Sequence, residues 1–259
     1  MTATFDFKGK SVLVTGASHG IGRAVAAGFA RSGADVTILS STPDINEAAR
    51  RIESETGRTV RAEVCDITDR GAVRRSVGGI GRIDVLVNNA GLELVTPMLA
   101  EDDAIEADFE RIIAINVVGT YYVTRQALRA MGPGSSIIIT SSVWGKTGAA
   151  DFAAYVSSKH ANIGFMRVLA KELGPKGIRV NAVCPGWVRT RAALRSLGKV
   201  SATAGVSDDE MLGEILSAQA LPGLMEPDDV ASLYLFLASD TGGNITGQAV
   251  NVDRGEVMA

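Results

Sequence analysis

Tyr155 and Lys159 are the two residues of this chain whose types and spacing most directly suggest catalysis. They lie in a stretch with helical periodicity, and residues four apart on a helix share one face, with Cβ atoms about 5–6 Å apart. A lysine ammonium near a tyrosine hydroxyl favours the phenolate and so lowers the tyrosine pKa. A tyrosine tuned in this way can exchange a proton with a carbonyl or alcohol oxygen. Because the same spacing arises by chance on solvated helix faces, the pair alone does not establish a site.

A second segment, SVLVTGASHGIG at residues 11–22, has the pattern of a nucleotide-binding turn. An apolar β-rich run ends at Gly16, and an apolar helical pattern begins at Ile21. A strand, a glycine turn and a helix together place main-chain N–H groups against a pyrophosphate. Gly16 can form the tight turn, Gly20 lets the main chain approach the phosphates, and Gly22 lets the helix lie close to the strand. A plain turn is the alternative interpretation.

The elements that must position these residues alternate regularly between strand and helix. We expect strands at Ser11–Thr15, Asp35–Leu39, Val60–Val64, Ile83–Val87, Ser136–Thr140, Arg179–Val183 and Ala249–Val252. We expect helices at Ile21–Ser32, Ile45–Thr56, Arg70–Val77, Glu106–Met131, Ala153–Leu173 and Asp228–Ala238. This alternation predicts an α/β fold: a doubly wound parallel sheet of about seven strands, Rossmann-like, with helices on both faces and a single domain over residues 1–259.

Composition and termini narrow the class of protein. A net charge of −3 gives no indication of nucleic acid or of an anionic membrane surface as a partner. The first ten residues lack the apolar core of a signal peptide, and no apolar run could span a bilayer, so we expect a cytoplasmic protein. Cys65 and Cys184 are expected to be buried thiols, and together with His19 and His160 they do not form a metal-binding pattern.

Ligands of such sheets bind beyond the carboxyl ends of the strands, which directs attention to the residues that follow each strand. Asn88-Asn89-Ala90-Gly91 follows the fourth expected strand, and Ser141-Ser142 follows the fifth. Residues 189–224 come after the sixth strand and have mixed polarity, with a short helical signal only near Ser207–Ala220. We expect this segment to be a substrate lid, and an ordinary surface insertion is the alternative.

Taken together and in this order, the motifs resemble the short-chain dehydrogenase/reductase family. They are Gly16-x3-Gly20-x-Gly22, Asn88-Asn89-Ala90-Gly91, Asn116, Ser142, Tyr155-x3-Lys159, Pro185-Gly186-x3-Thr190 and the C-terminal run from Ala238 to Gln248. The resemblance covers essentially the whole chain. It implies an NAD(P)-dependent oxidoreductase that interconverts a secondary alcohol and a ketone by hydride transfer.

The resemblance also implies residue roles. Tyr155 would be the general acid/base, Lys159 would hold the nicotinamide ribose and lower the tyrosine pKa, and Ser142 would bind the substrate oxygen. Asn116 would anchor a water that links Lys159 to solvent. The positions that match cofactor contacts are Gly16, Ser18, His19, Gly20, Ile21, Gly22, Ser40, Ser41, Asp66, Ile67, Asn89, Ala90, Gly91, Tyr155, Lys159, Pro185, Gly186, Val188 and Thr190.

The choice between the two dinucleotides depends on the end of the second strand, where a carboxylate would bind the ribose 2′-OH of NAD. That position is Ser40, so no carboxylate would repel a 2′-phosphate. The basic residue that NADP-dependent members often carry before the second glycine is replaced by His19, and Arg23 is the nearest arginine. The sequence favours NADP slightly over NAD.

The substrate site is expected to include Glu93, Ser142, Trp144 and Trp187. Phe152 stands where the hydroxybutyrate dehydrogenase branch has a carboxylate-binding lysine, so we favour a sugar, polyol or similar small alcohol. The alternatives are a 3-oxoacyl thioester reductase, a hydroxy acid dehydrogenase and, in another class, a non-catalytic dinucleotide sensor. Asp253-Arg254-Gly255 departs from the family's usual Asp-Gly-Gly.

The two longest expected helices, Glu106–Met131 and Ala153–Leu173, carry apolar residues on more than one face. One sheet covers only one stripe of each helix, and large exposed apolar patches are uncommon on monomers. In the family these helices meet their copies across a two-fold axis, and the C-terminal strand makes a second such contact. The resemblance therefore implies a homotetramer, with a dimer as the alternative.

Overall fold

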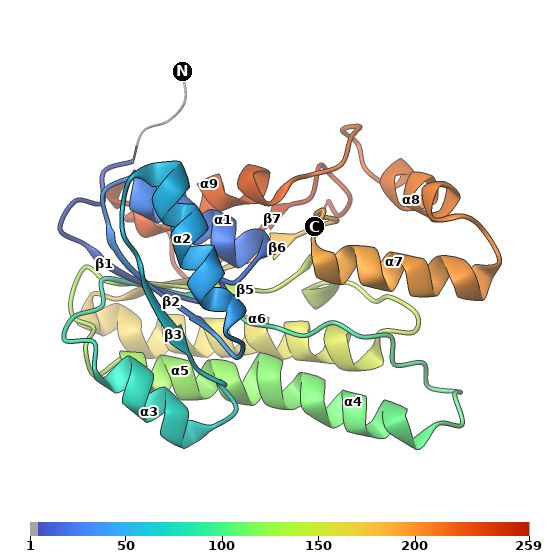
Figure 1. The fold of residues 1–259 in the computed structure, drawn as a ribbon, viewed down its shortest axis with the longest axis horizontal. Coiled ribbons are helices and arrows are strands. Elements are labelled where there is room, and N and C mark those ends of the chain that lie inside the picture. The colour runs from blue at the N-terminus through green and yellow to red at the C-terminus, as the bar shows by residue number, and fades with distance from the viewer. Residues whose placement is uncertain (1–4, 259) are drawn as a thin grey trace.

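A seven-stranded sheet, parallel throughout, forms the centre of the computed structural model, which describes residues 5–258 (Figure 1). The strands are β1 (Ser11–Thr15), β2 (Asp35–Ser40), β3 (Arg61–Val64), β4 (Val85–Asn88), β5 (Ser136–Thr140), β6 (Arg179–Pro185) and β7 (Ala249–Val252). They pair in the order β3-β2-β1-β4-β5-β6-β7. The predicted doubly wound, Rossmann-like sheet is confirmed.

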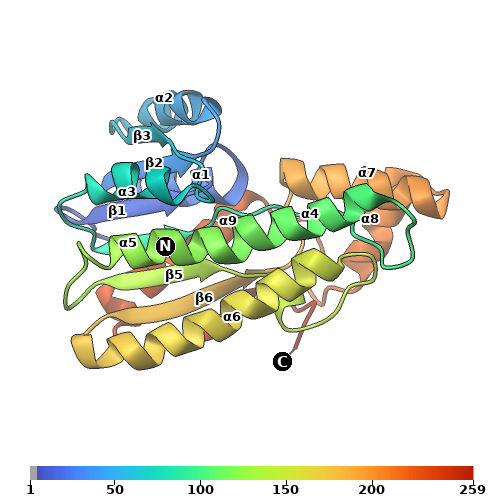
Figure 2. The same ribbon diagram turned by 90° about the horizontal axis from the view of Figure 1, so that it is seen from below.

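Helices cover both faces of the sheet, as Figures 1 and 2 show. One face carries α1 (Gly20–Arg31), α2 (Asp44–Thr56) and α9 (Pro227–Ala238), and the other carries α3 (Arg70–Gly78), α5 (Thr120–Ala127) and α6 (Ala153–Leu173). Side chains alternate between the two faces along each strand. Val12 and Val14 accordingly belong to the core beneath α1 and α9, whereas Leu13 belongs to the core beneath α5 and α6.

The strand order reverses beside β1, which pairs with β2 on one side and with β4 on the other. The connections that leave β1 and β4 therefore diverge to opposite faces of the sheet. A crevice opens between them at the carboxyl ends of the strands, where ligands of doubly wound sheets bind.

The predicted helix Glu106–Met131 is one continuous helical stretch with an interruption that the sequence did not reveal. It consists of α4 (Asp103–Ile113), a π-helical turn at Ala114–Gly119, and α5. The stretch begins earlier than expected because Asp102 caps α4 by accepting a hydrogen bond from Ala104 N at 2.9 Å. It ends at Ala127, four residues before the predicted end at Met131, and Gly132-Pro133 farther on cannot continue a helix.

Residues 189–224 contain two helices rather than the single short one expected. They are α7 (Arg191–Ala204) and α8 (Asp208–Ser217), and in Figures 1 and 2 they project from the body of the sheet. Thr190 caps α7 by accepting a hydrogen bond from Ala193 N at 3.1 Å, and Ser207 with Glu210 forms a capping box at the start of α8. The prediction missed α7 because small and polar residues dominate it, although its few large apolar residues, Leu194, Leu197 and Val200, keep a helical spacing. Within residues 5–258, no helix is both long and apolar enough to cross a membrane.

Candidate active site

Two cavities meet at Tyr155 on the carboxyl side of the sheet. The first, of 590 Å³, occupies the crevice between β1 and β4, and we call it the switch-point cavity. The second, of 380 Å³, is enclosed by the loops after β5 and β6 together with α7 and α8, and we call it the α7 pocket. Tyr155 lines both cavities, so its hydroxyl is available to whatever molecules occupy them.

Glycines shape the floor of the switch-point cavity. Gly16 has a φ of +65°, and a Cβ there would lie 2.6 Å from Ala90 Cα. A Cβ on Gly22 would lie 2.4 Å from both Gly16 O and Asn89 Nδ2. The Asn89 amide fixes this approach by donating to Thr15 O at 3.2 Å and to Gly16 O at 3.1 Å. The turn and the close contact between helix and strand that the sequence predicted are therefore present.

The structure divides the predicted cofactor residues between the two cavities. Those that line the switch-point cavity are Gly16, Ser18, His19, Gly20, Ile21, Ser40, Ser41, Asp66, Ile67, Asn89, Ala90, Gly91, Tyr155, Lys159 and Thr190. Pro185, Gly186 and Val188 line the α7 pocket instead. Thr190 lines both cavities. Gly22 lines neither cavity, because it lies beneath the turn.

Hydroxyl groups gather where the second strand ends, at Ser40 as expected. Ser40 Oγ donates to Ser18 Oγ at 3.3 Å, and Ser18 Oγ is 2.8 Å from His19 Nδ1. Burial and the nearby Arg191 guanidinium lower the pKa of His19, so the ring is neutral at neutral pH.

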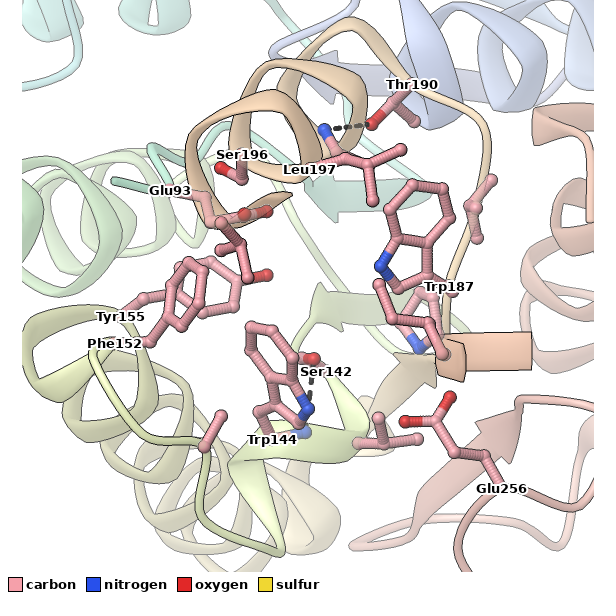
Figure 3. Close-up of a pocket in the computed structure, with 18 of the residues that line it drawn as sticks. Glu93, Ser142, Trp144, Phe152, Tyr155, Trp187, Thr190, Ser196, Leu197 and Glu256 are labelled. Carbon is pink, nitrogen blue, oxygen red and sulfur yellow. Dashed lines mark hydrogen bonds between the residues drawn. The ribbon is translucent and has the colours of Figure 1, made fainter. Parts of the chain in front are cut away.

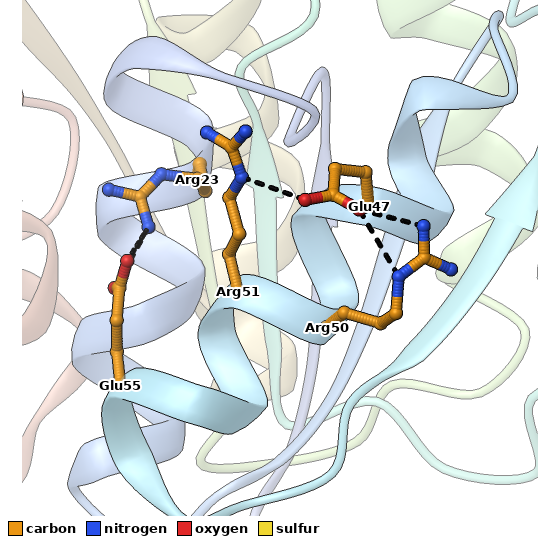
Figure 4. Close-up of polar contacts among 5 residues, drawn as sticks. All are labelled: Arg23, Glu47, Arg50, Arg51 and Glu55. Carbon is orange, nitrogen blue, oxygen red and sulfur yellow. Dashed lines mark hydrogen bonds and ion pairs between the residues drawn. The ribbon is translucent and has the colours of Figure 1, made fainter.

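Arg23 does not reach this group. Its guanidinium forms an ion pair with Glu55 at 2.7 Å, which joins α1 to α2 (Figure 4). On the neighbouring surface of α2, Glu47 binds Arg50 and Arg51 (Figure 4). The arginine nearest in sequence is therefore held away from the cavity, while Arg191 at the start of α7 lines it.

Lys159 faces the ring of Tyr155. Its Nζ lies 5.3 Å from the ring centroid and donates to Thr140 O at 2.8 Å. The lysine is 3% exposed, and burial lowers its pKa to about 8. The pKa of Tyr155 is raised, chiefly by burial and then by the Glu93 carboxylate, while a hydrogen bond with Ser142 opposes the rise. The pKa of Tyr155 is therefore raised and not lowered as expected, and Lys159 is not among the main groups that shift it.

Asn116 lies in the π-helical turn and is fully buried. Its Oδ1 accepts from Leu92 N at 2.7 Å, and its Nδ2 donates to Leu92 O at 3.0 Å and to Ser158 Oγ at 2.9 Å. It lines neither cavity. Asn116 therefore ties the loop after β4, which leads directly to Glu93, to helix α6.

The predicted substrate residues Glu93, Ser142, Trp144 and Trp187 all line the α7 pocket (Figure 3). Ser142 Oγ accepts from Trp144 N at 3.1 Å, which caps the short 3-10 turn Val143–Gly145. The Trp144 ring lies 4.8 Å from the Phe152 ring and 6.1 Å edge-on from the Tyr155 ring, measured between centroids. The tryptophan therefore restricts the position of the tyrosine.

Sequence reasoning missed two polar residues of the α7 pocket, Ser196 and Glu256 (Figure 3). Ser196 lies on α7, which the sequence did not reveal. Glu256 lies in the tail after β7, where no motif marks it. Neither residue carried a signal that could have been found without the fold. The described residues contain no group of side chains arranged to hold a metal ion, and Cys65 and Cys184 are buried free thiols.

Comparison with known proteins decides the family. A family model described as enoyl-(acyl carrier protein) reductase matches residues 16–256. Momilactone A synthase of rice (Oryza sativa subsp. japonica) is 36% identical over 257 residues, which cover 95% of this chain and 89% of the relative. The structure of a short-chain type dehydrogenase/reductase from Mycobacterium ulcerans is 33% identical with a TM-score of 0.85, covering 97% of this chain and 90% of that one. The chain belongs to the short-chain dehydrogenase/reductase family.

The predicted resemblance is confirmed, and this short-chain dehydrogenase/reductase is an oxidoreductase. A further solved relative is a short chain dehydrogenase from Burkholderia cenocepacia J2315 in complex with NADP. It is 32% identical with a TM-score of 0.82, and the match covers 96% of this chain and 98% of that one.

Proposed function

We propose that this enzyme interconverts a secondary alcohol and a ketone, with NADP or NAD in the switch-point cavity and the substrate in the α7 pocket. The observation that carries the proposal is the place of Tyr155, which lines both cavities. A residue at that junction can exchange a proton with the substrate oxygen while the carbon faces the cofactor.

The switch-point cavity fits a dinucleotide. Side chains on Gly16 and Gly22 would close the turn, and the N-terminus of α1 behind it favours phosphate groups. Asp66 and Ile67 would hold the adenine end, and Asn89 to Gly91 with Lys159 would hold the nicotinamide ribose. When bound, the nicotinamide supplies or accepts the hydride.

We propose NADP as the preferred cofactor. The hydroxyls of Ser40 and Ser18 stand where NAD-specific members carry a carboxylate, so nothing at that point repels a 2′-phosphate. Arg191 lines the same cavity near His19 and adds positive charge. The relative from Burkholderia cenocepacia, whose structure contains NADP, supports this choice.

The raised pKa of Tyr155 keeps its hydroxyl protonated at neutral pH. Tyr155 is therefore ready to donate a proton to a carbonyl oxygen in the reducing direction, and Ser142 would hold that oxygen beside it. In the oxidising direction Tyr155 must first lose its proton. The Lys159 ammonium 5.3 Å from the ring centroid stabilises the resulting negative charge. Asn116 serves as a positioning residue through its bonds to Leu92.

We propose that residues 189–224 form a lid, since α7 and α8 together contribute Ala193, Ser196, Leu197, Val200, Met211 and Ile215 to the wall of the α7 pocket. The aromatic and aliphatic lining supports a neutral alcohol with an apolar body. The same pocket also contains polar groups that can bind the hydroxyls of a sugar or polyol. They are Ser142, Ser196, Glu93 and Glu256. A 3-oxoacyl thioester is the second candidate, because an acyl chain also fits an apolar wall.

The proposal is tested with the purified enzyme, both oxidised and both reduced cofactors, and four substrate groups: cyclic alcohols, polyols, hydroxy acids and acyl thioesters. Turnover is measured by the absorbance of the reduced nicotinamide. We expect turnover of neutral secondary alcohols or their ketones, faster with NADP than with NAD. Turnover of hydroxy acids alone, or of no alcohol or ketone, would overturn the proposal.

A further inference from the structure

The charged residues that line the α7 pocket are both carboxylates, Glu93 and Glu256. None of the described residues in its lining is a lysine, arginine or histidine. In Figure 3 the two glutamates lie on opposite sides of the pocket, with Glu93 near Tyr155 and Glu256 beyond Trp187. A pocket walled in this way disfavours an anionic ligand at either end.

Glu93 has partners for its charge. Burial raises the pKa of its carboxyl group, and a hydrogen bond with Ser196 and the charges of Arg195 and Lys159 oppose that rise. Arg195 also donates to Glu93 O at 2.8 Å, which fixes the loop against α7. Glu93 therefore belongs to the end of the pocket where the reaction takes place, and its carboxyl group is already engaged.

Glu256 differs from Glu93 in having no cation beside it among the described residues, although the main chain of Trp187 hydrogen-bonds its carboxyl group. Its Oε2 is shielded from solvent and accepts no hydrogen bond, and within residues 5–258 the side chain forms no ion pair. Burial and the neighbouring Asp253 raise the pKa of the carboxyl group. The adjacent guanidinium of Arg254 points elsewhere and donates to Pro222 O at 2.9 Å.

The chain makes room for this carboxyl group. Gly186, which follows β6, has no side chain to fill this space: a Cβ there would lie 2.8 Å from Glu256 Oε2 and 2.8 Å from Asp253 Cβ. A buried acceptor without a donor is costly, and such groups in native proteins are usually satisfied. Because Glu256 lines the pocket, a donor on a ligand there can bind its carboxyl group and stabilise its charge.

We propose that Glu256 is a specificity-determining residue that binds a hydrogen-bond donor on the substrate, a hydroxyl or an ammonium group, at the end remote from the reacting carbon. The substrate would then have an apolar body against Trp144, Trp187 and Leu197, an alcohol or ketone at Tyr155, and a donor at Glu256. This inference rests on the proposed function and specifies its substrate class.

The test uses binding, which does not require turnover. The two tryptophans of the chain, Trp144 and Trp187, both line the α7 pocket, so their fluorescence reports its occupancy. The probes are 2-decalone and its derivatives with a hydroxyl, an ammonium or a carboxylate group on the ring remote from the ketone. They are titrated into the wild type, into Glu256→Gln, and into the control Glu214→Gln, which removes an exposed carboxylate of α8 outside the lining.

We expect the wild type to bind the hydroxyl and ammonium derivatives about ten-fold more tightly than 2-decalone, and the carboxylate derivative least tightly. In Glu256→Gln the advantage of the ammonium group should disappear and the disadvantage of the carboxylate should shrink. Glu214→Gln should keep the wild-type ranking.

Three results would overturn the inference: equal affinities of the wild type for all four probes, tightest binding of the carboxylate, or an equal effect of Glu256→Gln on every probe. If Glu256→Gln does not fold, the order of the wild-type affinities for the four probes still tests the inference. Reduction of 2-decalone with the reduced cofactors, measured separately, tests the proposed function, so the two failures are distinguishable.

Discussion

The Lys159 ammonium lies over the ring of Tyr155, 5.3 Å from its centroid, and donates to the Thr140 carbonyl. This arrangement places a positive charge against the π face of the proposed general acid/base and removes that charge from water. The same burial raises the pKa of the tyrosine and lowers that of the lysine to about 8. The Glu93 carboxylate raises the pKa of both residues, so one neighbouring charge acts on the tyrosine and on the lysine together.

Replacement of Tyr155 by phenylalanine should reduce kcat by at least about 100-fold, because only the proton donor is removed. The phenyl ring retains the contacts with Trp144 and Lys159, so the fold should persist. Steady-state kinetics and cofactor titration measure the two effects. Near-normal turnover by the variant would refute the assignment of Tyr155.

Replacement of Lys159 by methionine should abolish most activity and yet stabilise the ligand-free protein at pH 7. The unfolded lysine titrates near 10.5 and the folded one at about 8, so the wild type gains stability as pH rises between these values. At pH 7 the buried charge destabilises the fold, and its removal should add about 1–2 kcal/mol after loss of the bond to Thr140.

Thermal unfolding of wild type and Lys159→Met from pH 7 to pH 10 measures this difference. The stability advantage of the variant should shrink as the pH rises. A variant that is less stable than the wild type at pH 7 would show that the bond to Thr140 outweighs the buried charge.

Replacement of Glu93 by glutamine should shift the pH dependence of alcohol oxidation to lower pH. The Glu93 carboxylate raises the pKa of Tyr155 and also that of Lys159, so its neutral isostere lowers both. The pH at which kcat for alcohol oxidation rises measures this shift. Glu214→Gln, which removes one carboxylate on the surface of α8, is the control for the change in net charge. An unchanged pH of this rise would place Glu93 outside the proton chemistry.

Replacement of Ser40 by aspartate should weaken NADP binding strongly through repulsion of the 2′-phosphate and spare NAD. The Ser40 hydroxyl already lies in the cavity against Ser18, so the new carboxylate would occupy the same place. Titration with both cofactors measures the ratio of affinities. An equal change in both would show that Ser40 does not contact the ribose.

We propose a homotetramer in solution. Phe109, Val118, Tyr121 and Val168, on α4, the π turn, α5 and α6, are 39%, 37%, 39% and 52% exposed in the single chain, which leaves an apolar face uncovered. Light scattering at micromolar concentration should give the mass of four chains of 27.0 kDa. The mass of one chain would contradict the proposal.

The fold was predictable because its strands are short apolar runs bounded by turn residues, and each was placed within about two residues of its observed end. The proximity of Ser142, Tyr155 and Lys159 was predictable because they follow or adjoin those strands, and their catalytic roles remain a prediction. These features depend on residues that are close together in the sequence, and periodicity and motifs can therefore indicate them.

Other features depend on contacts between distant segments and carry no local pattern. Glu256 lines the α7 pocket beside Gly186, which is far away in sequence. The raised pKa of Tyr155 results from burial by several loops, so spacing to Lys159 alone gave the wrong direction. Helix α7 escaped detection because its apolar positions are few and separated by small residues.

Because of the π-helical turn at Ala114–Gly119, the structure of this region depends on the number of residues in the turn as well as on their types. A π turn contains about one residue more than an α-helical turn, so the stretch from Asp103 to Ala127 corresponds to an ordinary helix with a single residue inserted. Loss of one residue there would restore a regular helix but rotate α4 by about 100° relative to α5. Asn116 could then no longer bind the main chain of Leu92 while α4 and α5 both kept their present packing. Substitutions in this turn that keep Asn116 are therefore expected to disturb the site less than the deletion of a single residue.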